Sequence, residues 1–97
     1  MDKASKKLWD EYKAACATAH DAHIMWRGAE AAGGAVAAIM ARGVLAGSGC
    51  REMAEAVWAV ARDLRAKYDA AETAAEIIWK AWNDATPAAE IVAAVNA

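Results

Sequence analysis

The second half of the chain decides the fold, because residues 48–83 read SGCREMAEAVWAVARDLRAKYDAAETAAEIIWKAWN. Apolar side chains recur in this stretch at spacings of three and four, which is the period of one helix face. The order of the spacings follows an eleven-residue pattern with a period near 3.67, which indicates a nearly straight helix. The stretch therefore predicts one long helix whose buried stripe consists of Met53, Val57, Val60, Leu64, Tyr68, Ala71, Ala75, Trp79 and Trp82.

The length of this helix bears on how the chain assembles. A helix over residues 48–83 would be about 52 Å long at 1.5 Å per residue. A globule of 97 residues has a diameter of only about 32 Å. We therefore expect either a break near Tyr68 to Thr73 or an apolar stripe that a homodimer covers.

The first half of the chain predicts two further helices. The first runs over residues 3–27, with Asp2 or Ser5 as its N-cap and Gly28 as its C-terminal cap. The second occupies residues 29–42 and ends at Gly43. Gly33 and Gly34 lie inside it, where we expect close approach of another helix. The buried stripe of the first helix is Leu8, Tyr12, Ala15, Ala19, Ala22 and Trp26.

A short last helix and the composition complete the architecture. Thr86 as N-cap with Pro87 at the first helical position predicts a start near residue 87, and its apolar face carries Ile91, Val92 and Val95. The chain has 30 alanines and no phenylalanine, a composition that favours helix over strand. We predict an all-α fold: a single domain over residues 1–97, built as an up-and-down bundle of three to four helices.

Charge and cysteine content limit the classes of partner and the cellular compartment that we expect. The net charge is −2 with both signs interspersed, whereas a nucleic-acid surface needs a basic patch. We expect no signal peptide, because Asp10, Glu11 and Lys13 interrupt the first apolar cluster, and no apolar run approaches 20 residues. Two cysteines, Cys16 and Cys50, allow one disulfide at most. We expect a cytoplasmic protein with reduced thiols, without membrane contact and without a cofactor.

Cys16, His20 and His23 are the candidate metal ligands, because they fall within an arc of about 60° on a helix and are ligands that Zn²⁺ accepts. Cys16 and His23 would be about 10.5 Å apart along the axis, so only two of the three could share an ion. A half-buried strip, with Cys16 as a small hydrophobe, is the simpler interpretation. No set of side chains suggests a catalytic site.

Trp58 is the tryptophan that the stripe leaves out, about 100° from its centre and beside Arg62 and Arg65. Exposed tryptophan next to arginine is the composition of interface hot spots, although another helix of the bundle could cover Trp58. Ile77 and Ile24 also lie off their stripes. The candidate interaction residues are therefore Trp58, Arg62, Arg65 and Ile77.

These observations favour a non-enzymatic protein-interaction module, an adaptor, regulator or inhibitor that binds another protein or a second copy of itself. Small chains without chemistry, including those of phages and mobile elements, often work in this way. Two alternatives remain open. One is a bundle that binds a metal or small ligand through Cys16, His20 and His23. The other is a DNA-binding regulator, because residues 36–65 have the outline of a helix-turn-helix.

Overall fold

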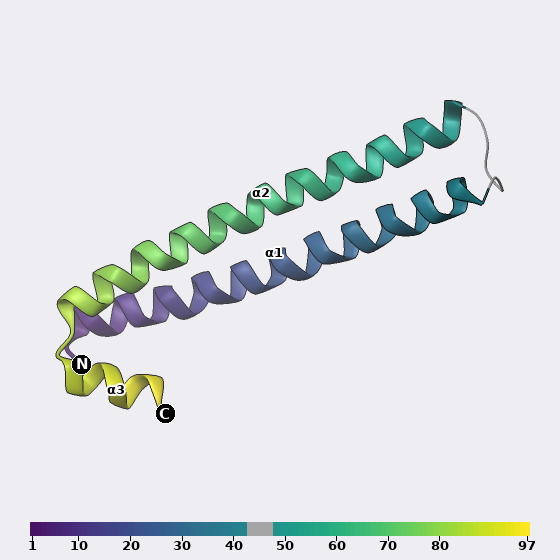
Figure 1. The fold of residues 1–97 in the computed structure, drawn as a ribbon. Helices are drawn as coiled ribbons and strands as arrows, with labels where there is room; N and C mark the ends of the chain where they lie inside the picture. Colours follow the sequence, from purple (N-terminus) through teal and green to yellow (C-terminus); the bar gives the residue numbers. More distant parts are fainter. Residues whose placement is uncertain (43–47) are drawn as a thin grey trace. The chain divides into compact units, whose positions relative to one another are not determined.

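A computed structural model describes residues 1–42 and 48–97, apart from the side chains of Ser48 and Cys50. These residues form three helices and no strand: α1 (Lys3–Ala41), α2 (Ser48–Ala85) and α3 (Ala88–Val95) (Figure 1). The all-α prediction and the long helix in the second half are confirmed. No helix among the described residues has an apolar stretch that could cross a bilayer.

The two helices predicted for the first half are one helix, α1, so the prediction of a cap at Gly28 was wrong. Gly28 is exposed, and a Cβ added there would meet nothing within 4 Å. Gly28 therefore makes the helix about 1 kcal/mol less stable than alanine would at this position, but it does not end the helix. The stripe predicted for residues 8–26 is confirmed, since each of its six residues is buried or half-buried. Gly43 lies outside the described residues.

Helix α2 runs without a break through residues 68–73, but its buried side differs from the predicted stripe. Met53 and Val60 are 52% and 53% exposed, while the neighbouring Ala54 and Ala61 are half-buried and buried. The buried positions repeat every seven residues, so the eleven-residue pattern was wrong. A seven-residue repeat is typical of helices that pack along their length. We call these positions the seam of α2: Ala54, Val57, Ala61, Leu64, Tyr68, Ala71, Ala75, Ile78 and Trp82.

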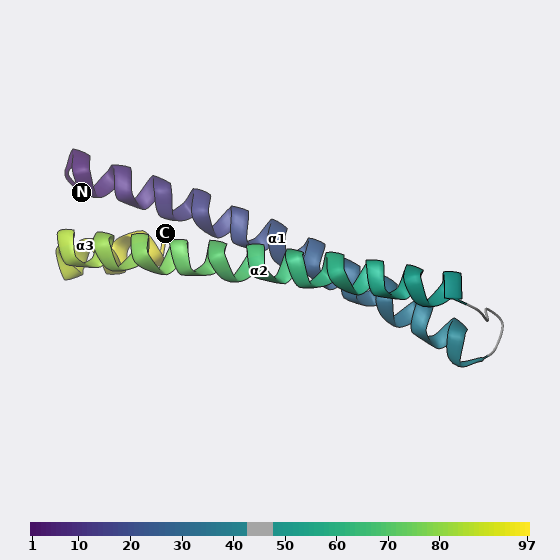
Figure 2. The ribbon, with the colours of Figure 1, turned by 90° about the horizontal axis from the view of Figure 1, so that it is seen from above.

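Helix α1 has a seam with the same repeat. Its positions seven residues apart are Ser5, Tyr12, Ala19, Trp26, Gly33 and Met40, all buried or half-buried. The chain divides into two compact units, and both helices contribute to each. Unit 1 comprises Met1–Ala19 and Ala70–Ala97, and unit 2 comprises His20–Asp69. Within each unit the segments of α1 and α2 run in opposite directions (Figures 1 and 2).

Unit 1 is filled by aromatic rings. The Trp82 side chain has no exposed surface, and its ring centroid lies 4.5 Å from that of Trp9 and 5.3 Å from that of Trp79. Tyr12 adds a contact with Trp79 at 5.0 Å. Such tilted ring pairs stabilise a fold beyond the area they bury. The core role predicted for Trp79 and Trp82 is thus confirmed.

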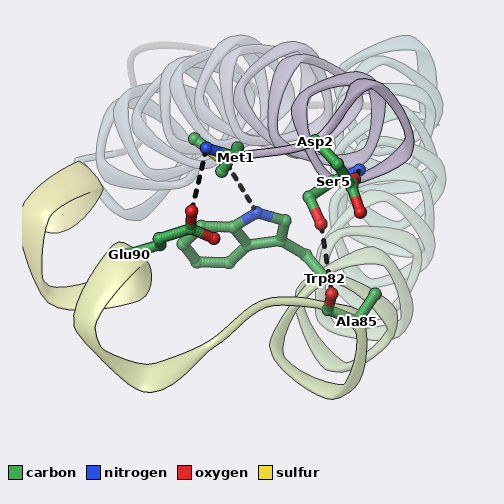
Figure 3. A network of polar contacts seen from close by, with 6 residues as sticks. All are labelled: Met1, Asp2, Ser5, Trp82, Ala85 and Glu90. Carbon is green, nitrogen blue, oxygen red and sulfur yellow. Dashed lines mark hydrogen bonds and ion pairs between the residues drawn. The ribbon is translucent and has the colours of Figure 1, made fainter.

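Polar contacts close the end of unit 1 around Trp82 (Figure 3). The indole Nε1 of Trp82 donates to the sulfur of Met1 at 3.4 Å, and the amino group of Met1 pairs with Glu90 at 3.2 Å. The Ser5 hydroxyl donates to the carbonyl oxygen of Ala85 at 3.1 Å. The backbone N–H of Ser5 donates to the Asp2 carboxylate at 2.7 Å, so Asp2 is the N-cap of α1.

Helix α3 begins one residue later than predicted. Pro87 is its N-cap rather than its first helical residue, and no side chain caps it. Thr86 is buried, and its hydroxyl has no hydrogen-bond partner among the described residues. The predicted cap at Thr86 was therefore wrong. On the apolar face of α3, Ile91 is half-buried, whereas Val92 and Val95 are exposed.

Candidate interaction surface

Unit 2 brings the two long helices close at Gly33. A Cβ added to Gly33 would lie 3.1 Å from the ring of Trp58, closer than ordinary van der Waals contact. Gly33 is buried, whereas Gly34 is exposed and a Cβ there would meet nothing within 4 Å. The predicted close approach is confirmed at Gly33 alone. One face of the Trp58 indole therefore rests on the backbone of α1.

Trp26 is the centre of a group of ring and cation contacts in unit 2. Its ring stacks on Tyr68 with centroids 5.6 Å apart, and the Arg65 guanidinium lies over it at 4.7 Å. His23 meets the edge of the same ring at 5.5 Å. Contact between a cation and an indole face is favourable at partly exposed sites, by about 0.5–1 kcal/mol. Trp26 thereby holds Arg65 in a defined place at the surface.

These side chains surround a shallow hollow with a volume of about 110 Å³. We call it the tryptophan–arginine hollow, and its lining consists of Trp26, Glu30, Trp58, Ala61, Arg62 and Arg65. Trp58 is 42% exposed, so the indole face that does not touch Gly33 is accessible from this side. The hollow thus offers two indole rings beside two guanidinium groups.

The charges around the hollow are only partly neutralised. Arg65 pairs with Asp69 at 3.9 Å, and Glu30 is held by Arg27 at 2.9 Å. Arg62 is exposed and has no ion-pair partner among the described residues. An arginine presents planar donors that match a carboxylate at two points. The hollow can therefore accept an apolar side chain next to a carboxylate.

The structure brings together three of the four predicted interaction residues. Trp58, Arg62 and Arg65 line the same hollow. Ile77 belongs to unit 1, where its side chain is 65% exposed, so it is not part of the hollow. Trp26 and Glu30 complete the lining, and sequence reasoning had placed Trp26 in the core alone. The seven-residue repeat of α1 sets Trp26 and Gly33 on the side that meets Ala61 and Trp58. This repeat is the sequence feature that could have indicated that Trp26 lines the hollow.

A second exposed surface of unit 2 was not predicted from the sequence. It follows the positions one before Trp26, Gly33 and Met40 on α1 and one before Ala54 and Ala61 on α2, so it lies on the opposite side of the helix pair from the hollow. The exposed Lys67, one before the seam residue Tyr68, bounds it. We call it the apolar face. Its large side chains are 37–58% exposed, and it consists of Met25, Ala32 and Ile39 of α1 with Met53 and Val60 of α2. It was missed because Met53 and Val60 were assigned to the buried stripe.

The candidate metal ligands Cys16, His20 and His23 do not line the hollow. Cys16 is a half-buried free thiol in unit 1, and its hydrogen bond with Tyr12 is the main reason why the pKa of that phenol is raised. His20 is exposed, while His23 packs on Trp26 and Tyr68 at 5.5 and 5.1 Å. Within residues 1–42 and 48–97, no three His, Cys, Asp or Glu side chains are placed to hold a metal ion. This geometry gives the metal alternative no support.

The helix arrangement also bears on the DNA-binding alternative. Gly33 lies against Trp58, and Trp26, seven residues earlier, lies against Arg65, seven residues later. The segments of α1 and α2 in unit 2 are therefore antiparallel neighbours. A helix-turn-helix crosses instead at about 90–120°. We find no support for that motif in unit 2.

No family model, curated protein or solved structure matches the chain.

Proposed function

We propose that this chain is a non-enzymatic protein-interaction module, and that the tryptophan–arginine hollow is where it binds another protein. The observation that carries the proposal is the half-exposed Trp58 indole, fixed on Gly33 and flanked by Arg62 and Arg65. Tryptophan and arginine are the residues most enriched at the energetic centres of interfaces. An indole already held in place loses little conformational entropy when a partner covers it.

The chemistry of the hollow favours a partner segment that carries an apolar side chain next to an acidic one. The apolar group would cover the free face of Trp58, and the carboxylate would pair with Arg62, which has no ion-pair partner among the described residues. Arg65 is already bound to Trp26 and Asp69 and would shape the rim. Cys16 as a free thiol is consistent with a reducing, cytoplasmic setting.

The proposal is tested by selecting a displayed library of random twelve-residue peptides on the immobilised full chain. We expect the enriched peptides to combine acidic residues with an aromatic or aliphatic residue. Their affinity for Trp58→Ala and for Arg62→Glu should fall at least about tenfold, the range of a modest hot spot. Lys80→Glu makes a similar charge change at an exposed position of unit 1 and should bind like the wild type.

Stability measurements separate this role from a structural one. Because Trp58 is 42% exposed, Trp58→Ala should cost well under the 3–5 kcal/mol typical of a buried tryptophan. A loss of that size, with unchanged peptide binding, would assign Trp58 to the core instead. A library that yields no peptide dependent on Trp58 or Arg62 would contradict the proposal.

A further inference from the structure

The apolar face on the other side of unit 2 carries an inference that does not depend on the hollow. The register that sets Gly33 against Trp58 also sets Ala32 within one residue of the level of Val60, and Ile39 within one residue of the level of Met53. Because α1 and α2 run in opposite directions, the positions directly before these seam residues lie on the same side of the helix pair on both helices. The four large side chains of this face are all more than a third exposed.

The outward side of α1 extends this surface. Between Asp21 and Arg42 the exposed positions on this side carry no charge, and they are Ile24, Met25, Gly28, Ala31, Ala32, Ala35, Ala38 and Ile39. The charged side chains within that span, Arg27 and Glu30, pair with each other at 2.9 Å, and Glu30 lines the hollow. A continuous apolar surface of this kind on a small chain marks an interaction site.

The residues of this helix side complement themselves when their order is reversed about the point midway between Ala31 and Ala32. Ile24 then meets Ile39, and Gly28 meets Ala35. At the two ends, Asp21 meets Arg42. Both end residues are exposed, and neither has an ion-pair partner among the described residues. A surface that matches its own reverse is what a two-fold symmetric contact requires, because each residue then faces its counterpart on an identical chain.

We propose that a second copy of this chain docks antiparallel on the apolar face, about a two-fold axis that passes near Ala32 and Val60. Helix α1 then packs along α1 of the partner, with Asp21 of one chain beside Arg42 of the other. The glycine and alanine positions allow the two helix backbones to approach closely, while Met25 and Ile39 fill the space on either side of the axis. In this arrangement two chains together supply four long helix segments around one apolar interior.

The decisive variant is Ala32→Glu, because it sets two carboxylates against each other at the axis. Mass is measured by light scattering on a sizing column from about 1 to 100 μM. We expect a wild-type dimer, and an increase in its Kd of at least about a hundredfold in Ala32→Glu, since like charges in a contact are strongly unfavourable. Ala37→Glu, at an exposed position on the other side of α1, is the matched control and should stay dimeric. Circular dichroism should show equal helicity in all three proteins.

A charge exchange tests the orientation. Asp21→Arg or Arg42→Asp alone should weaken the dimer about tenfold, because each places like charges at both ends of the contact. The double variant should recover most of the wild-type affinity. A monomeric wild type at 100 μM would overturn the proposal, as would a dimer that Ala32→Glu leaves intact. Trp58→Ala should leave the mass unchanged, and a dimer dissolved by Trp58→Ala alone would place the contact on the hollow instead.

Discussion

Unit 1 and unit 2 are built from the same two helices but are filled by different side chains. In unit 1, Trp9, Tyr12, Trp79 and Trp82 interlock, and Trp82 has no exposed surface. In unit 2 the helices meet at small residues, with Gly33 and Ala61 among the buried positions. Small residues bury little area for each contact. Unit 1 therefore contains more of the packing that stabilises the chain.

The difference extends to what each unit leaves exposed. Among the described residues, unit 2 exposes six large apolar side chains: Ile24, Met25, Ile39, Met53, Trp58 and Val60. The chain ends, which often fray, are fixed in unit 1 by Met1, Ser5 and Glu90. Unit 1 also exposes four large apolar side chains, Met1, Ile77, Val92 and Val95, but it contains the interlocked aromatic rings, whereas the exposed apolar side chains of unit 2 flank a seam of small residues. This division is what a small interaction module needs, because surface reserved for a partner cannot also stabilise the monomer.

The largest expected effect is that of Trp82→Ala in unit 1. It removes a fully buried indole and should lower the free energy of unfolding by about 3–5 kcal/mol. Trp58→Ala in unit 2 should cost about a third of that, since its indole is 42% exposed. Urea unfolding followed by circular dichroism measures both. Equal losses would show that the two units contribute alike to stability.

Overpacking the seam of unit 2 should have an intermediate effect. Ala61 is 4% exposed and lines the hollow beside Trp26 and Trp58. Ala61→Leu should therefore destabilise the chain by about 1–3 kcal/mol, because the added atoms push the helices apart. Ala66→Leu, five residues later at an exposed position, is the matched control. Its midpoint in the same unfolding experiment should stay close to the wild-type value.

The adjacent glycines of unit 2 offer a finer comparison. Gly34→Ala places a methyl group in open space and should stabilise α1 by up to about 1 kcal/mol. Gly33→Ala has the same gain in helix propensity, but its methyl group would lie 3.1 Å from the Trp58 ring. We expect it to be less stable than Gly34→Ala and to shift the Trp58 fluorescence. Equal stabilisation by both would mean that Trp58 does not rest on Gly33.

The sequence was most informative where large side chains occupied the seam. The stripe from Leu8 to Trp26 was predicted correctly, and so was a long helix over the second half of the chain. The prediction failed where alanine forms the seam. At residues 53–61 the larger Met53 and Val60 were taken as buried, although Ala54 and Ala61 face α1. Which side of α2 is buried depends on how it packs against α1. The spacing of apolar residues along α2 alone does not predict this.

Glycine gave the second error. Gly28 after Arg27 resembles a helix end, because a glycine commonly follows the last helical residue. Helix α1 nevertheless continues to Ala41, and its seam residues Gly33 and Met40 are buried and half-buried in unit 2. Packing along α1 thus offsets the local cost of the glycine. For the site, Trp58, Arg62 and Arg65 could be found from their position off the stripe. Trp26 and the apolar face needed the register between the helices.

The smallest effect concerns the start of α1, where unit 1 fixes the chain. The hydrogen bond from the Ser5 backbone N–H to Asp2 lowers the pKa of that carboxyl below 3.8. A pKa lowered on folding means that the ionised cap stabilises the chain above pH 3.8, and that this contribution disappears as the pH falls through the lower folded value. Asp2→Asn keeps a side-chain oxygen that can cap the helix but cannot titrate. Thermal unfolding of both proteins between pH 6 and pH 2 should therefore show their midpoints converging in acid. If the difference between them stays constant over that range, the Asp2 carboxylate does not cap α1 in solution.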